Sequence, residues 1–144
     1  EDVVLILVGG GELEKEIQQK VNNLGIDKSV LFMGVRKDIA NLFQAMDVLV
    51  FPSLYEGLPL TLIEAQASGI RVIASDTISK EVQISDSIEF FPLIDGEVRW
   101  SIEILKYKDG YERKNAISNI ITSGFDIEHN VAWFENFYSC LCTK

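Results

Sequence analysis

The fold of this chain is decided by the stretch Tyr55–Gly69, which reads YEGLPLTLIEAQASG and follows the apolar run Asp47–Pro52, DVLVFP. Proline is well tolerated in the first turn of a helix, because the amide that it lacks would have no partner there. Pro59 therefore marks the start of a helix, and Gly69 marks its end, since glycine readily adopts the left-handed backbone that follows a last turn. The stretch predicts a buried strand, a turn and a helix over Leu60–Ser68.

Apolar runs and helical spacings alternate on both sides of this stretch. Continuous apolar runs predict strands that are covered on both faces, at Val3–Val8, Ser29–Met33, Arg71–Ser75 and Ile88–Phe91. Helical spacing predicts helices between them, at Leu13–Leu24, after a cap at Asp38, and at Ile78–Ile84. Later helices are expected over Val98–Lys106, Tyr111–Thr122 and Ile127–Leu141. The alternation predicts an α/β fold with a doubly wound, mostly parallel, Rossmann-like sheet and extra C-terminal helices.

Length, charge and cysteine content narrow the class of protein. The 144 residues and a hydrophobic fraction of 47% predict a single domain, residues 1–144, with a packed core. A formal net charge of -9 argues against a broad basic surface, so we expect no nucleic-acid partner. No apolar run is long enough to cross a bilayer, and Cys140 and Cys142 are poorly spaced for a mutual disulfide, which predicts a cytoplasmic protein.

The last predicted helix is unusually rich in aromatic residues. They are Trp133, Phe134, Phe137 and Tyr138, and they occupy more of the helix circumference than one stripe facing a sheet requires. Two interpretations are equally well supported: the helix packs partly on a domain outside this sequence, or it is well buried in this one.

Two loops before the central stretch are weaker candidates for a ligand site. In VGGGELEKE, a dinucleotide-binding turn would need a third glycine where Glu14 stands, and Glu12 and Glu14 would repel a phosphate. We therefore interpret it as a structural turn. In the next loop, Arg36 and Lys37 either contact a ligand or are simply solvated cations, and Asp38 is more simply a helix cap.

The turn and helix of the central stretch combine acceptors and donors. Glu56 lies on the turn, and Glu64 lies on the helix, where side chains lean toward the N-terminus and hence toward the same edge. Backbone amides over Leu58–Thr61 lie at the positive end of the helix dipole, which suits a diphosphate. Because carboxylates accept hydrogen bonds from vicinal hydroxyls, the two acids could bind a ribose and a sugar on either side of that diphosphate.

These motifs resemble a known family. The run EGLPLTLIE, preceded by DVLVFPS and followed by AQASGIRVIASD, resembles the C-terminal domain of family 4 glycosyltransferases, which use sugar nucleotides and have the GT-B fold. The match continues upstream through LVGGGELEKEI and VLFMGVRKDIANLFQAMDVLVFPS, so that it covers roughly Val3–Val82. The turn and helix are especially similar to bacterial exopolysaccharide and capsule glycosyltransferases. The resemblance implies a hexosyltransferase that takes a nucleoside diphosphate sugar as donor substrate, retains the anomeric configuration and needs no metal or other cofactor.

The resemblance also implies roles for individual residues. Glu56, the one candidate catalytic residue, would contact hydroxyls of the donor sugar in a binding rather than an acid–base role, and Glu64 would bind the nucleotide ribose. The segment Val35 and Arg36 would meet the base. The sugar and diphosphate would be lined by Gly57, Leu58, Pro59, Leu60 and Thr61. Many relatives carry a Gly-Gly-x-x-Glu run where this chain has Thr77–Glu81, TISKE, which puts a close backbone approach there in doubt.

The sequence is expected to be a fragment of a larger two-domain enzyme, because Glu1 and Asp2 lead directly into a core strand without an initiator methionine. The resemblance implies that the acceptor binds the missing N-terminal domain, and that an Arg and a Lys upstream of Val3 neutralise the diphosphate. We therefore expect the fragment alone to be inactive and to bind nucleotide weakly at most. Peripheral membrane association of the parent stays open.

Two other functions compete with this one. A sugar-nucleotide epimerase can use the same two-domain fold, although it would need additional acid and base residues in its cleft. A non-catalytic module could instead bind a nucleotide sugar, or a partner chain through the aromatic face of the last helix.

Overall fold

A computed structural model describes residues 3–142 of the chain, so that Glu1, Asp2, Thr143 and Lys144 lie outside the described part, as does the side chain of Cys142. The chain folds as two compact units, Glu1–Ile39 and Ala40–Lys144. Each unit contains a parallel sheet with helical connections, and each is described by itself. The expectation that the whole chain forms one domain stays a prediction.

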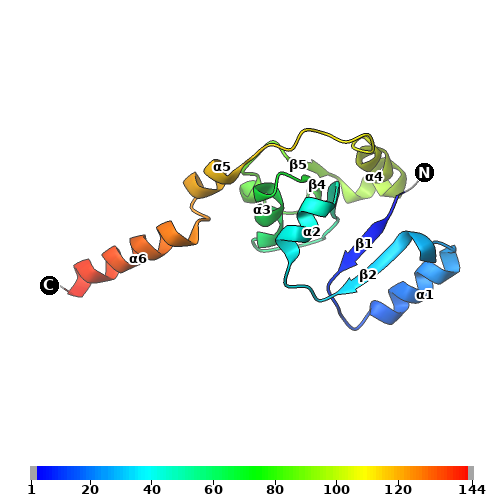
Figure 1. The fold of residues 1–144 in the computed structure, drawn as a ribbon, viewed down its shortest axis with the longest axis horizontal. Coiled ribbons are helices and arrows are strands. Elements are labelled where there is room, and N and C mark those ends of the chain that lie inside the picture. The colour runs from blue at the N-terminus through cyan, green and yellow to red at the C-terminus, as the bar shows by residue number, and fades with distance from the viewer. Residues whose placement is uncertain (1–2, 143–144) are drawn as a thin grey trace. The chain divides into compact units, whose positions relative to one another are not determined.

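The first unit is a strand, helix and strand (Figure 1). Strand β1 (Leu5–Val8) pairs in parallel with β2 (Val30–Gly34), and α1 (Glu14–Leu24) and a short 3-10 turn, η1 (Asp27–Ser29), connect them. Helix α1 ends where the sequence predicts, because Gly25 adopts a left-handed φ of 67° and donates its amide to carbonyls of the last turn. The first strand begins two residues later than predicted.

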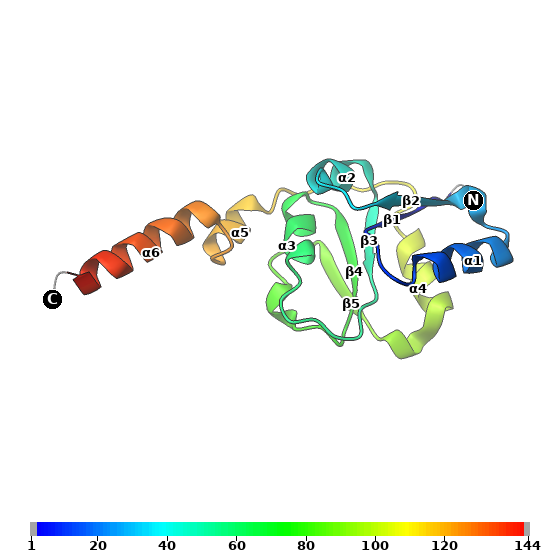
Figure 2. The same ribbon diagram turned by 90° about the horizontal axis from the view of Figure 1, so that it is seen from below.

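The second unit is built on a parallel sheet in the order β3 (Val48–Phe51), β4 (Arg71–Ser75) and β5 (Ile88–Phe91). Helix α2 (Ile39–Ala45) precedes β3, and α3 (Leu60–Ala67) connects β3 to β4. Figures 1 and 2 show α3 on one side of β4 and β5, and α4 (Gly96–Leu105), which follows the 3-10 turn η3 (Leu93–Asp95), on the other. The largest fully buried aliphatic side chains come from α3, β4 and the turns beside them: Leu62, Ile70, Val72, Ile73 and Val82. The predicted α/β class with parallel strands is confirmed.

The segment predicted as a helix over Ile78–Ile84 contains only a 3-10 turn, η2 (Lys80–Val82). The reason is Gln66 of α3, whose side chain is fully buried. Its Oε1 accepts hydrogen bonds from the amides of Ile84 and Ser85, and its Nε2 donates to the carbonyl of Val82 over 2.7 Å. These backbone groups therefore bond to a side chain of another element instead of continuing a helix.

The helix expected over Tyr111–Thr122 begins only at α5 (Ile117–Thr122). The preceding residues bond to the sheet edge at which the strands begin: the Tyr111 hydroxyl accepts from the amide of Arg71 and donates to the carbonyl of Asp47. The Arg113 guanidinium donates to carbonyls of Phe43 and Met46, at the end of α2. These two side chains attach the segment to the start of the sheet and to α2, and the helix begins only after them.

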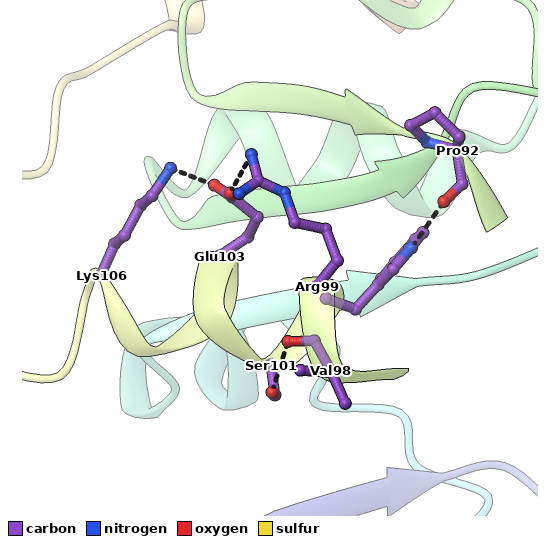
Figure 3. A network of polar contacts seen from close by, with 7 residues as sticks. Pro92, Val98, Arg99, Ser101, Glu103 and Lys106 are labelled. Atoms are coloured by element: carbon purple, nitrogen blue, oxygen red, sulfur yellow. Dashed lines mark hydrogen bonds and ion pairs between the residues drawn. The ribbon is translucent and has the colours of Figure 1, made fainter. Parts of the chain in front are cut away.

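A charged network lies on α4 (Figure 3). The Glu103 side chain is 1% exposed, and one of its oxygens lies 2.8 Å from Arg99 Nη2, an ion pair in which the donor is not aligned as a hydrogen bond. Its other oxygen accepts from Lys106. On the same helix Trp100 donates its indole N–H to the carbonyl of Pro92 over 3.0 Å. The buried acid is therefore compensated by cations whose side chains are half-exposed.

The last helix, α6 (Ile127–Cys142), directly follows Asp126, which accepts hydrogen bonds from the backbone amide and the ring of His129. Its aromatic side chains contact one another, as in the stacked pair Trp133 and Phe137 with ring centroids 5.3 Å apart. Every described side chain from Val131 to Leu141 is exposed. The interpretation that this helix is buried in the domain is therefore wrong for the described residues.

Candidate functional site

The predicted site residues of the second unit lie beyond the C-terminal ends of β3 and β4. Phe51 pairs with Ala74 at the end of the parallel ladder, so the loops that follow these strands start side by side. The first loop continues into α3, which carries the second predicted acid. This edge is where open parallel sheets bind their ligands.

Glu56 is half-buried on the turn after β3. Its Oε1 accepts a hydrogen bond from the Ser53 hydroxyl over 2.8 Å, and no partner for its other oxygen occurs among residues 3–142. The carboxylate is therefore held on one side and has an acceptor oxygen available on the other.

Glu64 is exposed in the middle of α3. Within the described part of the chain, its carboxylate has no hydrogen-bond or ion-pair partner. The flanking positions Ile63 and Ala65 are buried, so the helix turns this acid away from its packed face. No described residue of the second unit therefore hydrogen-bonds to the acceptor oxygens that the predicted ribose role would use.

The N-terminus of α3 is uncapped. Pro59 is buried, takes the position before the first helical residue and can donate no amide. Leu62 donates to the carbonyl of Pro59 over 3.0 Å, whereas the amides of Leu60 and Thr61 have no partner in the described chain. Leu58, Leu60 and Thr61 are exposed, and a β-carbon at Gly57 would meet no atom within 4 Å. The helix end therefore presents backbone donors with open space beside them.

Val35 and Arg36 lie in the first unit, after β2. Val35 is 84% exposed, and a β-carbon at Gly10 would come within 3.8 Å of its side chain. Arg36 is bound through Nε and Nη2 to both carboxylate oxygens of Asp38, at 2.8 and 2.7 Å. Asp38 directly precedes α2, the position expected of a helix cap, but both of its carboxylate oxygens accept hydrogen bonds from Arg36.

This pairing favours the charged forms of both residues. The hydrogen bonds and charge of Asp38 raise the pKa of Arg36, and the hydrogen bonds from Arg36 lower the pKa of Asp38. Part of the Arg36 guanidinium is therefore already engaged within its own unit, and the role toward a base stays a prediction.

Sequence reasoning missed the polar residues that hold Glu56. The Thr77 hydroxyl, on the loop after β4, donates to the carbonyl of Ser53 over 3.0 Å. It also lies 2.7 Å from the hydroxyl of Ser75, which is fully buried at the end of β4. The sequence signals were a serine three residues before Glu56 and a threonine where relatives have glycine, and neither reveals a contact between loops.

Chemically, this edge of the second unit offers two carboxylates with acceptor oxygens available and a helix end with amide donors available. Ligand hydroxyl groups suit the carboxylates, and a ligand oxyanion suits the amides of the helix end. Among the described residues, no group of three or more His, Cys, Asp or Glu side chains is arranged to hold a metal ion. No helix in residues 3–142 combines the length and apolarity needed to cross a bilayer.

A family model described as "Glycosyl transferases group 1" matches residues 1–90. EpsF of Bacillus subtilis (strain 168), named as a glycosyltransferase, is 34% identical over 97% of this chain. An Escherichia coli enzyme named UDP-Gal:alpha-D-GlcNAc-diphosphoundecaprenol alpha-1,3-galactosyltransferase is 30% identical over 95% of it. The chain spans 37% of the length of each of these relatives.

Among solved structures, HepE of Anabaena in complex with UDP matches 90% of this chain and 41% of its own, with a TM-score of 0.64 and 23% identity. HepE in complex with UDP-glucose matches 72% of this chain and 30% of its own, with a TM-score of 0.58 and 28% identity. These structural neighbours share the GT-B fold, as the sequence motifs predict. With the family model spanning more than half of its length, the chain belongs to the glycosyl transferases group 1 family.

Proposed function

We propose that this chain is the donor-binding domain of a retaining glycosyltransferase, which transfers a hexosyl group from a nucleoside diphosphate sugar in bacterial polysaccharide biosynthesis. One observation carries the proposal: Glu56 and Glu64 flank an uncapped helix end, and each has an acceptor oxygen without a partner in the described chain. The diphosphate would take the amides of Leu60 and Thr61, the sugar would take Glu56, and the ribose would take Glu64. Gly57, Leu58 and Pro59 would line the sugar and diphosphate.

The choice of nucleotide for testing this proposal comes from the relatives. The Escherichia coli relative is named as using UDP-Gal, and HepE is described in complex with UDP and UDP-glucose. We therefore propose a UDP-sugar as the first donor to test, bound without a metal ion. Val35 and Arg36 are proposed to contact the base.

The reaction of the parent enzyme also needs groups that the described site does not supply. A diphosphate leaving group develops charge in the transition state, and a helix end compensates that charge only in part. We propose that a second domain of the parent binds the acceptor and supplies further cations, and that the parent works in the cytoplasm. This chain alone would then bind donor weakly and would not turn it over. Sustained release of UDP from a UDP-sugar by the purified chain would contradict this part.

Calorimetric or NMR titration of the chain with UDP tests the donor site. Glu64→Ala should weaken UDP binding roughly 10-fold or more, because a hydrogen bond to a charged group contributes about 1.5–3 kcal/mol. Glu135→Ala is the matched control, since Glu135 is an exposed glutamate of α6. Equal affinity of the Glu64→Ala variant and the control would contradict the ribose role.

A further inference from the structure

A series of hydrogen bonds runs from Ser75, at the end of β4, to Glu56, on the loop after β3. The donor and acceptor of each bond follow from the chemistry of the groups involved. The carbonyl of Ser53 can only accept, so the single hydroxyl proton of Thr77 is directed at it. The Ser75 hydroxyl must then donate to the Thr77 oxygen at 2.7 Å, while it accepts from the Thr77 amide at 3.2 Å. Ser75 is fully buried at the end of β4, which fixes the start of the chain of bonds.

The last link runs from Ser53 to the acid. An ionised carboxylate only accepts hydrogen bonds, so the Ser53 hydroxyl donates to Glu56 Oε1 at 2.8 Å. The same hydroxyl lies at a longer 3.2 Å from the carbonyl of Tyr55. The resulting order is Ser75 to Thr77, Thr77 to the backbone of Ser53, and Ser53 to Glu56. It connects the loops after β3 and β4.

We propose that Ser53 is a positioning residue that presents Glu56 to the donor sugar, and that Thr77 keeps Ser53 in place. The proposal rests on the proposed donor role of Glu56. A glutamate on a turn loses considerable side-chain entropy when it becomes ordered, and a carboxylate that is already held loses less on binding. Removing the Ser53 hydroxyl therefore weakens the contribution of the sugar to affinity and leaves the contribution of the nucleotide unchanged.

The test uses paired variants of the complete 144-residue chain. Ser53→Ala removes the hydroxyl, whereas Ser53→Thr keeps it. Thr77→Val removes the hydroxyl at the second link, and Thr77→Ser keeps it. If Ser53→Ala impairs folding, which a thermal melt would reveal, the Thr77 pair tests the same connection from the neighbouring loop.

The first measurement requires no ligand. The carbon-13 shift of the Glu56 side-chain carboxyl, assigned with Glu56→Gln, should move in Ser53→Ala and Thr77→Val and should return toward the wild-type value in Ser53→Thr and Thr77→Ser. An unchanged shift in Ser53→Ala would overturn the positioning role.

The second measurement is the ratio of the Kd for UDP to the Kd for UDP-glucose or UDP-galactose. We expect this ratio to fall about 3- to 10-fold in Ser53→Ala with the Kd for UDP unchanged, and to be restored in Ser53→Thr. A parallel loss of affinity for UDP would indicate a general structural effect and overturn the proposal. If wild type binds too little UDP to measure, the ratio cannot be formed, and the carboxyl shift alone decides whether Ser53 orients Glu56.

Discussion

The hydroxyl of Tyr111 accepts a hydrogen bond from the backbone amide of Arg71 over 2.9 Å, across a sequence separation of 40 residues. The same hydroxyl donates to the carbonyl of Asp47 over 2.7 Å. One phenol thus joins the beginnings of β3 and β4, at the edge opposite the candidate site.

Tyr111→Phe should lower the free energy of unfolding by about 1–3 kcal/mol, because it leaves an amide and a carbonyl at that edge without their side-chain partner. Urea denaturation measures the loss. Tyr138→Phe is the control, since Tyr138 is 60% exposed on α6. Equal stability of the two variants would mean that solvent satisfies the strand ends equally well.

Gln66→Leu should destabilise the second unit by roughly 2 kcal/mol or more, because it strips partners from the backbone of Val82, Ile84 and Ser85. Gln44→Leu is the matched change, since Gln44 is exposed and donates a single 3.3 Å hydrogen bond to Ser68. Amide hydrogen exchange gives a local measurement: the Ile84 and Ser85 amides should exchange faster in Gln66→Leu alone. Unaltered exchange there would contradict the anchoring role.

Gly69→Ala should lower the free energy of unfolding by about 2–4 kcal/mol. The loss has two causes: alanine is strained in a left-handed backbone conformation, and its β-carbon would clash with a neighbouring atom. Gly69 has a φ of +73°, and an added β-carbon would lie 2.8 Å from the carbonyl oxygen of Lys114. Gly110→Ala separates the two effects, because Gly110 has a φ of +85° with no atom within 4 Å of an added β-carbon. Thermal or urea unfolding should show the larger loss for Gly69→Ala, and the reverse order would contradict the clash.

Burial and the hydrogen bond to Glu89 raise the pKa of Tyr107 to about 12, above the usual value of about 10 for tyrosine. Between these values the folded chain keeps a proton that the unfolded chain releases, so stability should fall as the pH rises through this window. Tyr107→Phe removes this titration, and the stability gap between wild type and variant should narrow from pH 9 to pH 11. Absorbance at 295 nm should also lose a late-titrating phenolate in the variant, and a gap that widens would contradict the sign.

Removal of divalent metal ions should leave UDP binding unchanged, because the proposed donor site uses amides and hydrogen-bond acceptors rather than a metal. Titrations in EDTA and in added magnesium or manganese chloride test this expectation. A 10-fold or greater gain in affinity with either metal would contradict it. Glu56→Gln would then show whether the gain depends on that carboxylate.

The sequence predicted strands well where backbone pairing alone defines them. The strands over Arg71–Ser75 and Ile88–Phe91 have the predicted bounds, and α3 starts after Pro59 as expected. The helix over Ile78–Ile84 was predicted incorrectly because a distant side chain takes over backbone hydrogen bonds there. Gln66 does so for Ile84 and Ser85, and no local pattern near residue 84 reveals a glutamine 18 positions away.

The geometry of the candidate site, like the fold, was predictable where local sequence determines it and was missed where it depends on contacts between distant segments. Glu56, Glu64 and the uncapped helix end follow from spacing, proline chemistry and family resemblance. The contact from Thr77 to Ser53 bridges 24 residues and depends on strand order, which apolar runs alone do not determine. The roles of Val35 and Arg36 stay predictions.

Helix α3 has two different roles at positions only two residues apart: Glu64 is exposed and is proposed to bind the ribose, whereas Gln66 is fully buried and accepts hydrogen bonds from amides of a distant loop. A substitution that rotates or shortens this eight-residue helix would therefore alter ligand recognition and loop anchoring together. Within this segment, variants selected for altered donor preference should concentrate at outward positions near the helix start, such as Thr61, whereas changes at Glu64 should weaken binding of every nucleotide donor. Inward positions should tolerate little change, so directed evolution of donor choice should vary the outward positions of α3 and keep the inward ones fixed.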